Sequence, residues 1–590
     1  MRWAQRHLAA LIMVLATALT AAGCVSVPRS GPIEKVEGPQ PGWQNPVNVE
    51  VRPPGSSDKP KEIVEGYLRA TSNYQPNYSV ARQFLTGAAT ETWRPEAGVS
   101  VYREESMVER GNTVTLKGSL VGTLGADRAY TANDTSLEIN FSLIEEPGGW
   151  RINNPPKKLM VAEYSFKSFY RSYDRYFVGN GTSLVPDPIY LPALSNPANA
   201  ASALMKALLN GPSDWLKPAV TSAIPPNTSL SVDSVTITNN GIAEVPLSDP
   251  VLQLPDQQRG LLAAQVVYTL RQVTGVKGVL IKVNQQPYRV PWSDPNSQVI
   301  SVDAIPQDMD PVPYVAGEEL YAVQHGKVKR VTPTPDSPSL ENLAGPQAGK
   351  NPVDALAVSV NNTDFAVTTN GRTVLRRGLI TSGELSTLPL SGVTELLRPQ
   401  FSRYGEIWDI GLAGDRQWIW RFTDDGKKIT VDKIDLPVVR DQKVTAFRIS
   451  PDGTRFALVR SAGNESKLWL GTIMRSDKIT VDGWRVLNTT QTNMTQIHRI
   501  ADIAWLDATE LLVLGAADST VAFAPFRVVD DASRITAQGN RENWDPAELA
   551  VSPWRQTAVI VDGSGHTWKY DGSLWLPFIK DQVQTVSDPS

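Results

Sequence analysis

The stretch VTAFRISPDGTRFALVRSAGNESKLWLGTI, residues 444–473, shows the pattern that dominates the C-terminal half of this 590-residue chain. Three segments of alternating apolar residues are separated by turns rich in Pro, Asp, Gly and Asn. That combination predicts three antiparallel strands joined by short turns. Similar units recur about every 45 residues, as internal repeats do. The residues at the end of the first strand in four of them are Ser402, Ser450, Leu506 and Ser552.

A repeat of this kind predicts a β-propeller, because one small antiparallel sheet cannot bury both of its faces without neighbours. We expect residues 306–590 to form a closed all-β propeller of about six blades. The hairpin EELYAVQHGKVKRVT, residues 318–332, is expected to join the last blade and close the ring. A solenoid of stacked sheets is the less favoured alternative.

The segment 161–305 is predicted to be a second domain, of the α+β class. A strand–turn–strand unit comes first, and a helix begins at Pro197 with Ser195 or Asn196 as its cap. Asn240-Gly241 predicts a hairpin turn between two apolar arms. A second helix, QQRGLLAAQVVYTLRQVTG, is expected to stop at Gly275, and the strand GVLIKVNQQP follows.

Short sequence motifs in this second segment resemble those of the GerMN domain of spore and envelope lipoproteins. They are LLNGP, SAIPPNTSL, AEVPLS, AQVVYTL and GVKGVLIKV, in that order. These residues are turn glycines, helix stops and core aliphatics, so the resemblance implies a shape and not a reaction. Tyr268 and Thr269 form a polar pair, but a tyrosine ring in the core with its hydroxyl bonded nearby is the favoured interpretation.

The first folded segment, residues 59–160, begins with helical periodicity and then changes to period-two strands. Helices followed by antiparallel strands, with a final short strand at WRI, resemble the NTF2-like α+β cone fold. Some members of that class hold a catalytic Asp or His in the cone. Here Glu145 and Glu146 lie beside Pro147-Gly148, which indicates a solvated turn.

The N-terminus has a basic start at Arg2 and Arg6 and an apolar run that ends in Ala-Ala-Gly before Cys24, the one cysteine of the chain. This pattern is typical of a signal peptide, residues 1–23, and its end resembles a bacterial lipobox. The resemblance implies a diacylglyceryl group on the Cys24 thiol, cleavage before Cys24, and N-acylation such as palmitate. An ordinary secretory signal is the alternative. Residues 24–58, rich in Pro, Gly and Ser, are expected to be a flexible tether.

Composition argues against several classes of function. Loss of the two arginines in the signal changes the formal net charge from -4 to -6, so nucleic-acid binding is not expected. The three later histidines, His325, His498 and His566, are not spaced for a metal site. Neither a catalytic motif nor a cofactor fingerprint was found, so we predict no enzyme, no cofactor and no metal. Trp408, Trp418 and Trp420 are expected to pack between propeller sheets rather than stack on sugars.

The order of lipobox, cone-like domain, GerMN domain and propeller resembles the LpqB lipoprotein family of actinobacteria over nearly the whole chain. The resemblance implies an accessory lipoprotein on the extracytoplasmic face of the cell membrane. Its implied partner is the extracellular sensor domain of the MtrB histidine kinase, in a two-component system that governs cell-wall and division genes. The alternative is a cell-wall glycan-binding protein or hydrolase that uses the propeller centre.

Overall fold

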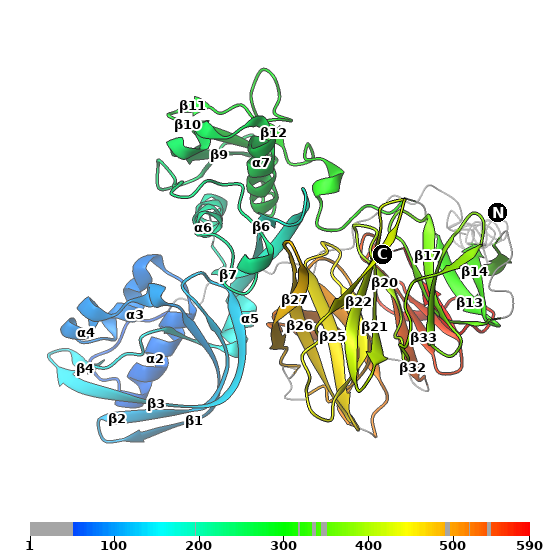
Figure 1. Cartoon of the computed structure of the whole chain (residues 1–590). Helices are drawn as coiled ribbons and strands as arrows, with labels where there is room; N and C mark the ends of the chain where they lie inside the picture. Colours follow the sequence, from blue (N-terminus) through cyan, green and yellow to red (C-terminus); the bar gives the residue numbers. More distant parts are fainter. Residues whose placement is uncertain are drawn as a thin grey trace, which may run out of the picture. The chain divides into compact units, whose positions relative to one another are not determined.

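The computed structural model describes residues 51–589 except 195, 317–318, 333–337, 344–350, 490–495, 519 and 540–543. Figure 1 shows the described chain coloured along the sequence, with a helix-bearing sheet first, a small α+β unit next and a ring of sheets last. Each of these parts buries its own set of apolar side chains. The chain is therefore multidomain, with two α+β domains and an all-β domain.

The N-terminal part packs short helices against a curved antiparallel sheet, as expected for the NTF2-like class. The five strands are ordered β4-β3-β2-β1-β5, and only the β1–β5 pair is parallel. Shifts of register in β1 and β2 bend the sheet around helix α2, where Ile63, Val64 and Tyr67 are fully buried. The elements are α2 (Pro60–Ser72), η1 (Pro76–Tyr78), α3 (Ser79–Gln83), α4 (Gly87–Thr92), η2 (Pro95–Ala97), β1 (Val99–Arg110), β2 (Thr113–Leu124), β3 (Tyr130–Glu146), β4 (Gly149–Ile152), β5 (Leu159–Ala162) and α5 (Glu163–Phe169).

The middle part begins with a two-stranded hairpin and continues into a small sheet covered by two helices. Asn196 accepts a hydrogen bond from the Ala198 amide at the start of α6, so the predicted cap is confirmed. The elements are β6 (Tyr170–Val178), β7 (Leu184–Pro192), α6 (Pro197–Leu209), η3 (Lys217–Ala219), β8 (Thr236–Ile237), β9 (Ile242–Leu247), η4 (Asp249–Gln253), α7 (Asp256–Leu270), β10 (Gly278–Val283), β11 (Gln286–Pro287), β12 (Ile300–Ser301) and η5 (Gln307–Met309).

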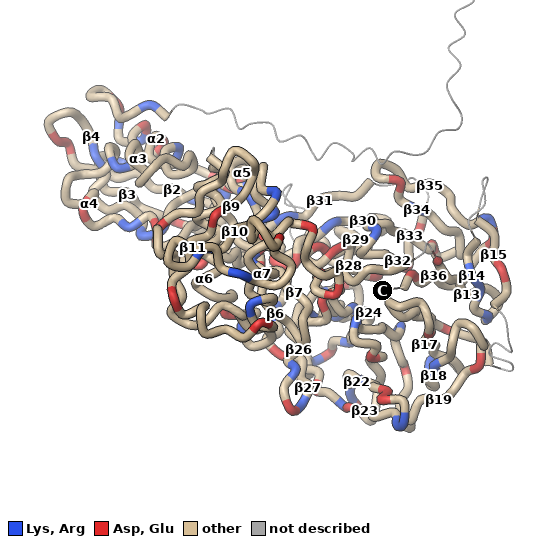
Figure 2. The backbone as a smooth tube through the Cα atoms, turned by 90° about the horizontal axis from the view of Figure 1, so that it is seen from above, with Lys and Arg blue, Asp and Glu red and all other residues tan. Residues whose placement is uncertain are grey.

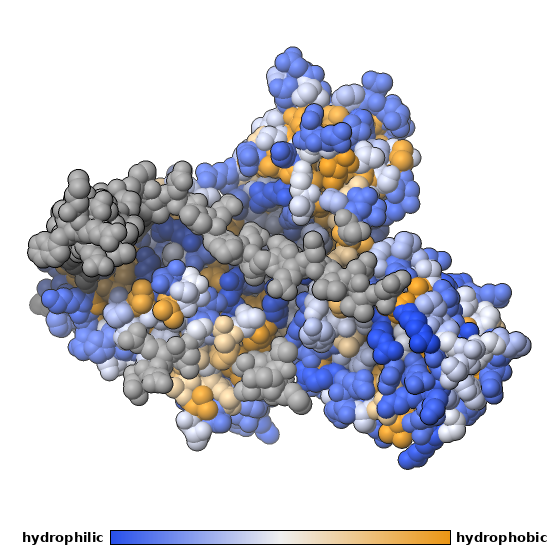
Figure 3. All heavy atoms as spheres, turned by 180° about the vertical axis from the view of Figure 1, so that it is seen from behind, coloured by the Kyte–Doolittle hydropathy of each residue, from blue (hydrophilic) through white to orange (hydrophobic). Residues whose placement is uncertain are grey.

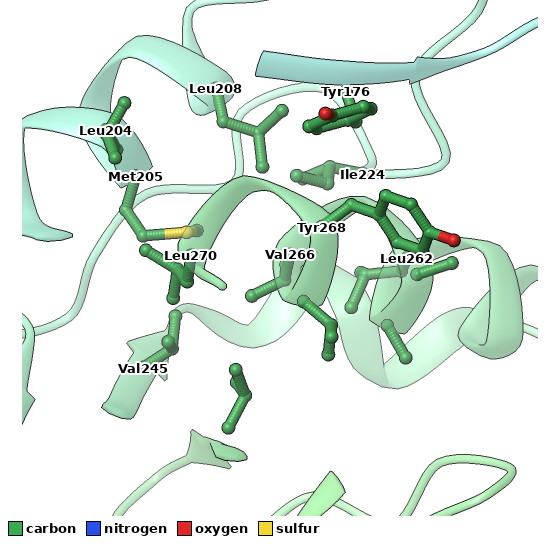
Figure 4. Close-up of a cluster of buried hydrophobic side chains, with 14 of the residues drawn as sticks. Tyr176, Leu204, Met205, Leu208, Ile224, Val245, Leu262, Val266, Tyr268 and Leu270 are labelled. Atoms are coloured by element: carbon green, nitrogen blue, oxygen red, sulfur yellow. The ribbon is translucent and has the colours of Figure 1, made fainter. Parts of the chain in front are cut away.

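Helix α7 is the core element of this middle part, as Figure 4 shows. Val266 and Leu270 are fully buried against Leu204 and Met205 of α6. The predicted stop at Gly275 is wrong by five residues, because the helix ends at Leu270. The chain then makes turns in which the Val273 and Val276 amides donate to carbonyls three residues back, and Gly275, with φ of 85°, completes them.

The C-terminal part is a propeller of six four-stranded sheets, each antiparallel throughout. The strands are β13 (Leu320–Gln324), β14 (Lys327–Thr332), β15 (Ser339–Asn342), β16 (Val353–Val358), β17 (Asp364–Thr369), β18 (Val374–Leu379), β19 (Leu385–Thr387), β20 (Gln400–Phe401), β21 (Ile407–Ala413), β22 (Arg416–Asp424), β23 (Ile429–Ile434), β24 (Lys443–Ile449), β25 (Arg455–Ala462), β26 (Glu465–Arg475), β27 (Ile479–Val486), β28 (Arg499–Trp505), β29 (Glu510–Ala516), β30 (Ala524–Val529), β31 (Ile535–Ala537), β32 (Pro546–Ser552), β33 (Thr557–Asp562), β34 (Thr567–Tyr570), β35 (Trp575–Pro577) and β36 (Thr585–Ser587).

The ring closes through a sheet shared by the two ends of the propeller segment. β36 near the C-terminus pairs with β13, so the order in this sheet is β15-β14-β13-β36. The predicted hairpin therefore helps to close the ring, but it forms a blade with β36 instead of joining the last blade. The last repeat already has four strands of its own, β32 to β35, which leaves no place for the hairpin.

Candidate functional site

The residues singled out from sequence lie apart from one another. Cys24 lies outside the described residues. His325 precedes Gly326 in a turn with positive φ, and His566 lies in the β33–β34 turn with its Nδ1 3.4 Å from an Asp562 oxygen. His498 directly precedes β28. Within the part of the chain that the structure describes, no group of three or more His, Cys, Asp or Glu could hold a metal ion.

The three tryptophans of the third blade are packed, as expected. Trp408 is fully buried and Trp420 is nearly so. Trp418 is half-buried, with the Arg416 guanidinium 3.6 Å and the Lys433 ammonium 3.8 Å from its ring centre. These cation–π contacts compete with the stacking of a sugar on this ring.

The polar residues of the α+β parts also have structural partners. The Tyr268 ring is buried, and its hydroxyl donates to the Asp310 carboxylate at 2.9 Å. The Thr269 hydroxyl accepts a hydrogen bond from the Tyr176 backbone amide. Glu145 and Glu146 are exposed at the end of β3, which agrees with the predicted turn.

The centre of the propeller holds a layer of charged side chains that sequence reasoning missed. The innermost strands β24, β28, β32 and β36 surround this centre in Figure 2. Arg398 donates from Nε to the Leu356 carbonyl, from Nη1 to Leu549 and from Nη2 to Val586, on β16, β32 and β36. One guanidinium thus joins three blades to the segment that leads into the third.

A buried ion pair joins the other blades in the same layer. Arg448 on β24 donates through Nη2 to both carboxylate oxygens of Asp502 on β28, at 2.9 Å each. Asp502 also accepts the Leu549 amide of β32. Burial and the neighbouring Arg448 lower the pKa of Arg398 to about 10, so Arg398 stays protonated at neutral pH. The layer braces all six blades.

A cavity of about 60 Å³ lies beside this layer, at the ends of the innermost strands. Its walls include Arg398, Arg448 and Asp588, and its rim carries Trp554. Trp554 is 37 % exposed and meets Tyr314, itself half exposed, edge to face at 5.1 Å between ring centres. A concave, partly open space with apolar and aromatic walls and a few charged groups is the usual form of a small-molecule site.

The segment Asp310–Val315, here called the strap, crosses one side of the cavity. Val312, Pro313 and Val315 of the strap line the space. Arg403 holds the strap in place, because its Nη1 donates to the carbonyls of Asp310 and Pro311. The cavity is therefore built from blade ends on one side and a fixed extended segment on the other.

A second buried charged cluster lies where the β6–β7 hairpin contacts the propeller. Arg455 on β25 pairs with Asp452 at 2.6 Å and with Asp530 at 3.0 Å, and it also donates to the Pro186 carbonyl of β7. The Tyr190 hydroxyl of β7 donates to the Asp531 carboxylate at 2.9 Å. We call these residues the junction.

Two carboxyl groups of the junction, those of Asp530 and Asp531, are hard to ionise. Burial raises the pKa of Asp530 to about 7, although Arg455 acts in the opposite direction. Burial also raises the pKa of the neighbouring Asp531. Other charged groups that act on Asp530 include Arg485 of β27, Asp187 of β7 and Asp174 of β6, and burial raises the pKa of Asp174 to about 7 as well. Protonation and hairpin contact are therefore linked at this place.

The surface is mostly mixed in polarity. In the view of Figure 3, hydrophobic side chains gather on the upper lobe, which Figure 1 identifies as the part with α6, α7 and β9 to β12. Exposed apolar residues of that part include Val232, 48 % exposed, and Leu252, 45 % exposed. Among the described residues, no helix is long and apolar enough to cross a membrane.

Family models match three successive segments of the chain. Residues 53–167 match the description "Lipoprotein LpqB, N-terminal domain", residues 174–289 match "Sporulation and spore germination", and residues 326–589 match "Lipoprotein LpqB beta-propeller domain". Fold and matches together define a multidomain lipoprotein whose last domain is a propeller. The chain belongs to the LpqB lipoprotein family.

Curated relatives are similar over nearly the full length. Lipoprotein LpqB of Cutibacterium acnes is 26 % identical to this chain, and the alignment covers 97 % of this chain and 98 % of the relative. Lipoprotein LpqB of Streptomyces avermitilis is 25 % identical, with 93 % of this chain and 94 % of the relative covered. Among solved structures, TolB from Acinetobacter baumannii has a TM-score of 0.35 at 12 % identity, covering 57 % of this chain and 86 % of that chain.

A signal for the missed central layer is present in the repeats. Arg448 and Asp502 both interrupt apolar first strands, in AFRIS and IADIAW. A charged residue on the innermost strand of a propeller faces the ring axis or the adjacent blade, where it requires a partner. The pairing of Arg448 with Asp502 joins neighbouring repeats, which no single repeat reveals.

Proposed function

We propose that this chain is a lipid-anchored accessory protein that binds the extracellular sensor domain of an MtrB-like histidine kinase. By that binding it modulates two-component signalling linked to the cell wall and division. The observation that carries the proposal is membership of the LpqB family over nearly the full length. No binding residue comes with the family, so the contact surface has to be found by experiment.

The anchor is part of the proposal. Cys24 after its signal carries diacylglyceryl and N-acyl groups that hold the chain on the extracytoplasmic face of the cell membrane. A tethered protein has a high effective concentration near membrane-proximal ectodomains, so a weak contact can be occupied. Mass spectrometry of the mature N-terminus tests this, and an unmodified N-terminus at another position would contradict it. Cys24→Ala should release a folded chain from the membrane.

Docking, and not catalysis, is the proposed mode of action. A glycan hydrolase would need a pair of carboxylates at the propeller centre, one as acid and one as base or nucleophile. The described residues that line the cavity include one carboxylate, Asp588, beside Arg398, Arg403 and Arg448. This lining favours a binding role for the centre over hydrolysis.

The exposed apolar residues of the middle part suggest where to look for the docking surface. Leu252→Glu and Val232→Asp place charge on residues that are nearly half exposed, so both variants should keep their stability. Binding to the purified kinase ectodomain is measured by surface plasmon resonance, with Val438→Asp on the propeller as a matched control, since Val438 is 67 % exposed. We expect Leu252→Glu to weaken binding at least tenfold. Equal binding by all variants would exclude this surface.

A further inference from the structure

The cavity at the propeller centre contains a cation without a counterion, and we propose that it binds a small carboxylate-bearing ligand. The ligand's carboxylate would contact the Arg398 guanidinium, and its short apolar part would contact the Trp554 ring. This goes beyond docking to a protein partner, because it assigns a small-molecule site to the propeller.

Arg398 is bonded but not neutralised. Its three nitrogens donate to three carbonyls, so one N–H on each Nη is still available among the bonds of the described residues. None of the ion pairs of the described residues includes Arg398, and Glu548 and Asp502 act on it only from farther away. Arg398 is partly buried, and a cation that is partly removed from water without a paired anion is unfavourable, so an anionic ligand would gain from binding here.

Arg448, in the same layer as Arg398, has a carboxylate as its counterion. Both Asp502 oxygens accept its Nη2, and both side chains are 8 % exposed. The two arginines lie in one cavity wall, yet only Arg448 has a carboxylate. A ligand carboxylate at Arg398 would give the second arginine the partner that the first already has.

The remaining walls determine the size and character of the ligand. A volume of about 60 Å³ is several times the roughly 10–15 Å³ that one water needs, which suits a carboxylate on a short chain. Val312 and Pro313 of the strap and the half-open Trp554 ring supply apolar contact. Arg403 fixes the strap, so the site is formed before the ligand arrives.

One group in the cavity wall, the Asp588 carboxylate, repels a bound anion when it is charged. Burial raises the pKa of Asp588 to about 7, with Arg555 and Ser552 acting the other way, and an Arg555 nitrogen lies 3.8 Å from it. Asp588 is therefore charged at pH 8 and largely neutral at pH 6. Carboxylate binding should be tighter at pH 6 than at pH 8, and Asp588→Asn should remove most of that difference.

Butyrate is the probe for this site, because it combines one carboxylate with a short apolar chain. The melting temperature of the mature full-length chain is measured in butyrate, in butyramide and in inorganic phosphate, each at an ionic strength matched with sodium chloride. We expect butyrate at about ten times its Kd to raise the melting temperature by about 3 °C and butyramide to have no effect. Equal stabilisation by phosphate would overturn the apolar half of the proposal, and no effect of butyrate would overturn all of it.

Variants separate a binding site from a structural brace. Arg398→Gln should abolish the response to butyrate, whereas Arg416→Gln on β22, which does not line the cavity, should leave it unchanged. Because Arg398 also joins blades, Trp554→Ala serves as the variant that keeps the brace, and it should weaken butyrate binding about tenfold at unchanged stability. An unchanged butyrate affinity in both Trp554→Ala and Asp588→Asn would contradict the proposal even if Arg398→Gln fails to fold.

Discussion

The propeller centre and the junction both bury charged side chains, but with opposite signs in excess. At the centre, Asp502 pairs with Arg448, whereas Arg398 donates to backbone carbonyls and has no carboxylate at ion-pair distance among the described residues. At the junction, Arg455 faces both Asp452 and Asp530, and Asp531 lies next along the chain. Each region is held by hydrogen bonds between separate blades or separate domains.

The sign of the excess charge decides what each region can respond to. A centre with a spare cation gains from an added anion, whereas a junction with spare carboxylates gains from added protons. Both regions are held together by buried ion pairs and hydrogen bonds, but we expect one to respond to anions and the other to pH.

Removal of the Arg455 guanidinium should have the largest effect. Arg455 is 1 % exposed and holds two buried carboxylates, so Arg455→Ala leaves both without a cation. We expect a loss of about 3–5 kcal/mol in the free energy of unfolding of the propeller. Urea unfolding, monitored by tryptophan fluorescence, measures this loss.

The matched control is Arg416→Ala, which removes a half-buried arginine whose partner, Asp435, is 79 % exposed. That variant should lose less than about 1 kcal/mol. If the two variants were equally stable, the stability of the junction would not depend on the ion pairs of Arg455.

The contact between hairpin and propeller should weaken as pH rises. A carboxyl whose pKa is raised by burial binds its proton more tightly in the docked state, so docking is favoured in acid. The advantage is complete below the ordinary pKa near 4 and is lost as pH rises towards about 7. For Asp530 alone this amounts to about 1.4 kcal/mol per pH unit within that window.

Energy transfer between dyes on the hairpin's domain and on the propeller reports docking from pH 5 to pH 8. Asp530→Asn should reduce the slope of the profile, because the amide stays neutral throughout, and the remaining slope comes from Asp531 and Asp174, whose pKa values are also raised by burial. Asp482→Asn, an exposed surface change, should leave the profile as in the wild type. A wild-type profile that rises with pH would contradict the assigned sign.

A smaller effect is expected from the hydroxyl of Tyr190. Tyr190→Phe keeps the buried ring but removes the hydrogen bond to Asp531. Loss of one bond to a carboxylate should weaken docking by about 1–2 kcal/mol. The same energy-transfer assay at pH 6 measures it. An unchanged signal would mean that Asp531 does not need this donor.

Repetition made the propeller predictable from sequence, because each blade repeats one pattern of turns and apolar strands. Asn196 and the Asn240-Gly241 turn were predictable for the same reason, since caps and turns are local. The closing pair of β13 with β36 was predicted less well, because those strands are about 260 residues apart and pair only after the whole ring forms.

The candidate sites were harder to predict than the fold. Arg398 lies in an unremarkable stretch, LLRPQ, and its role depends on three carbonyls from distant repeats. Asp530 and Asp531 follow an apolar strand as ordinary turn residues, yet both are buried, and Tyr190 in the hairpin of another domain bonds to Asp531. Interactions of this kind depend on tertiary packing and leave no local pattern.

In-cell photocrosslinking of the anchored chain tests whether it docks to a sensor histidine kinase. A photoreactive amino acid at position 252 on the wild-type chain, followed by mass spectrometry, should give a covalent adduct with the ectodomain of a membrane sensor histidine kinase. The same label on the Cys24→Ala chain should give little adduct, because the chain no longer stays at the membrane. Absence of kinase peptides from every labelled surface, together with turnover of a cell-wall glycan by the purified chain, would contradict the account.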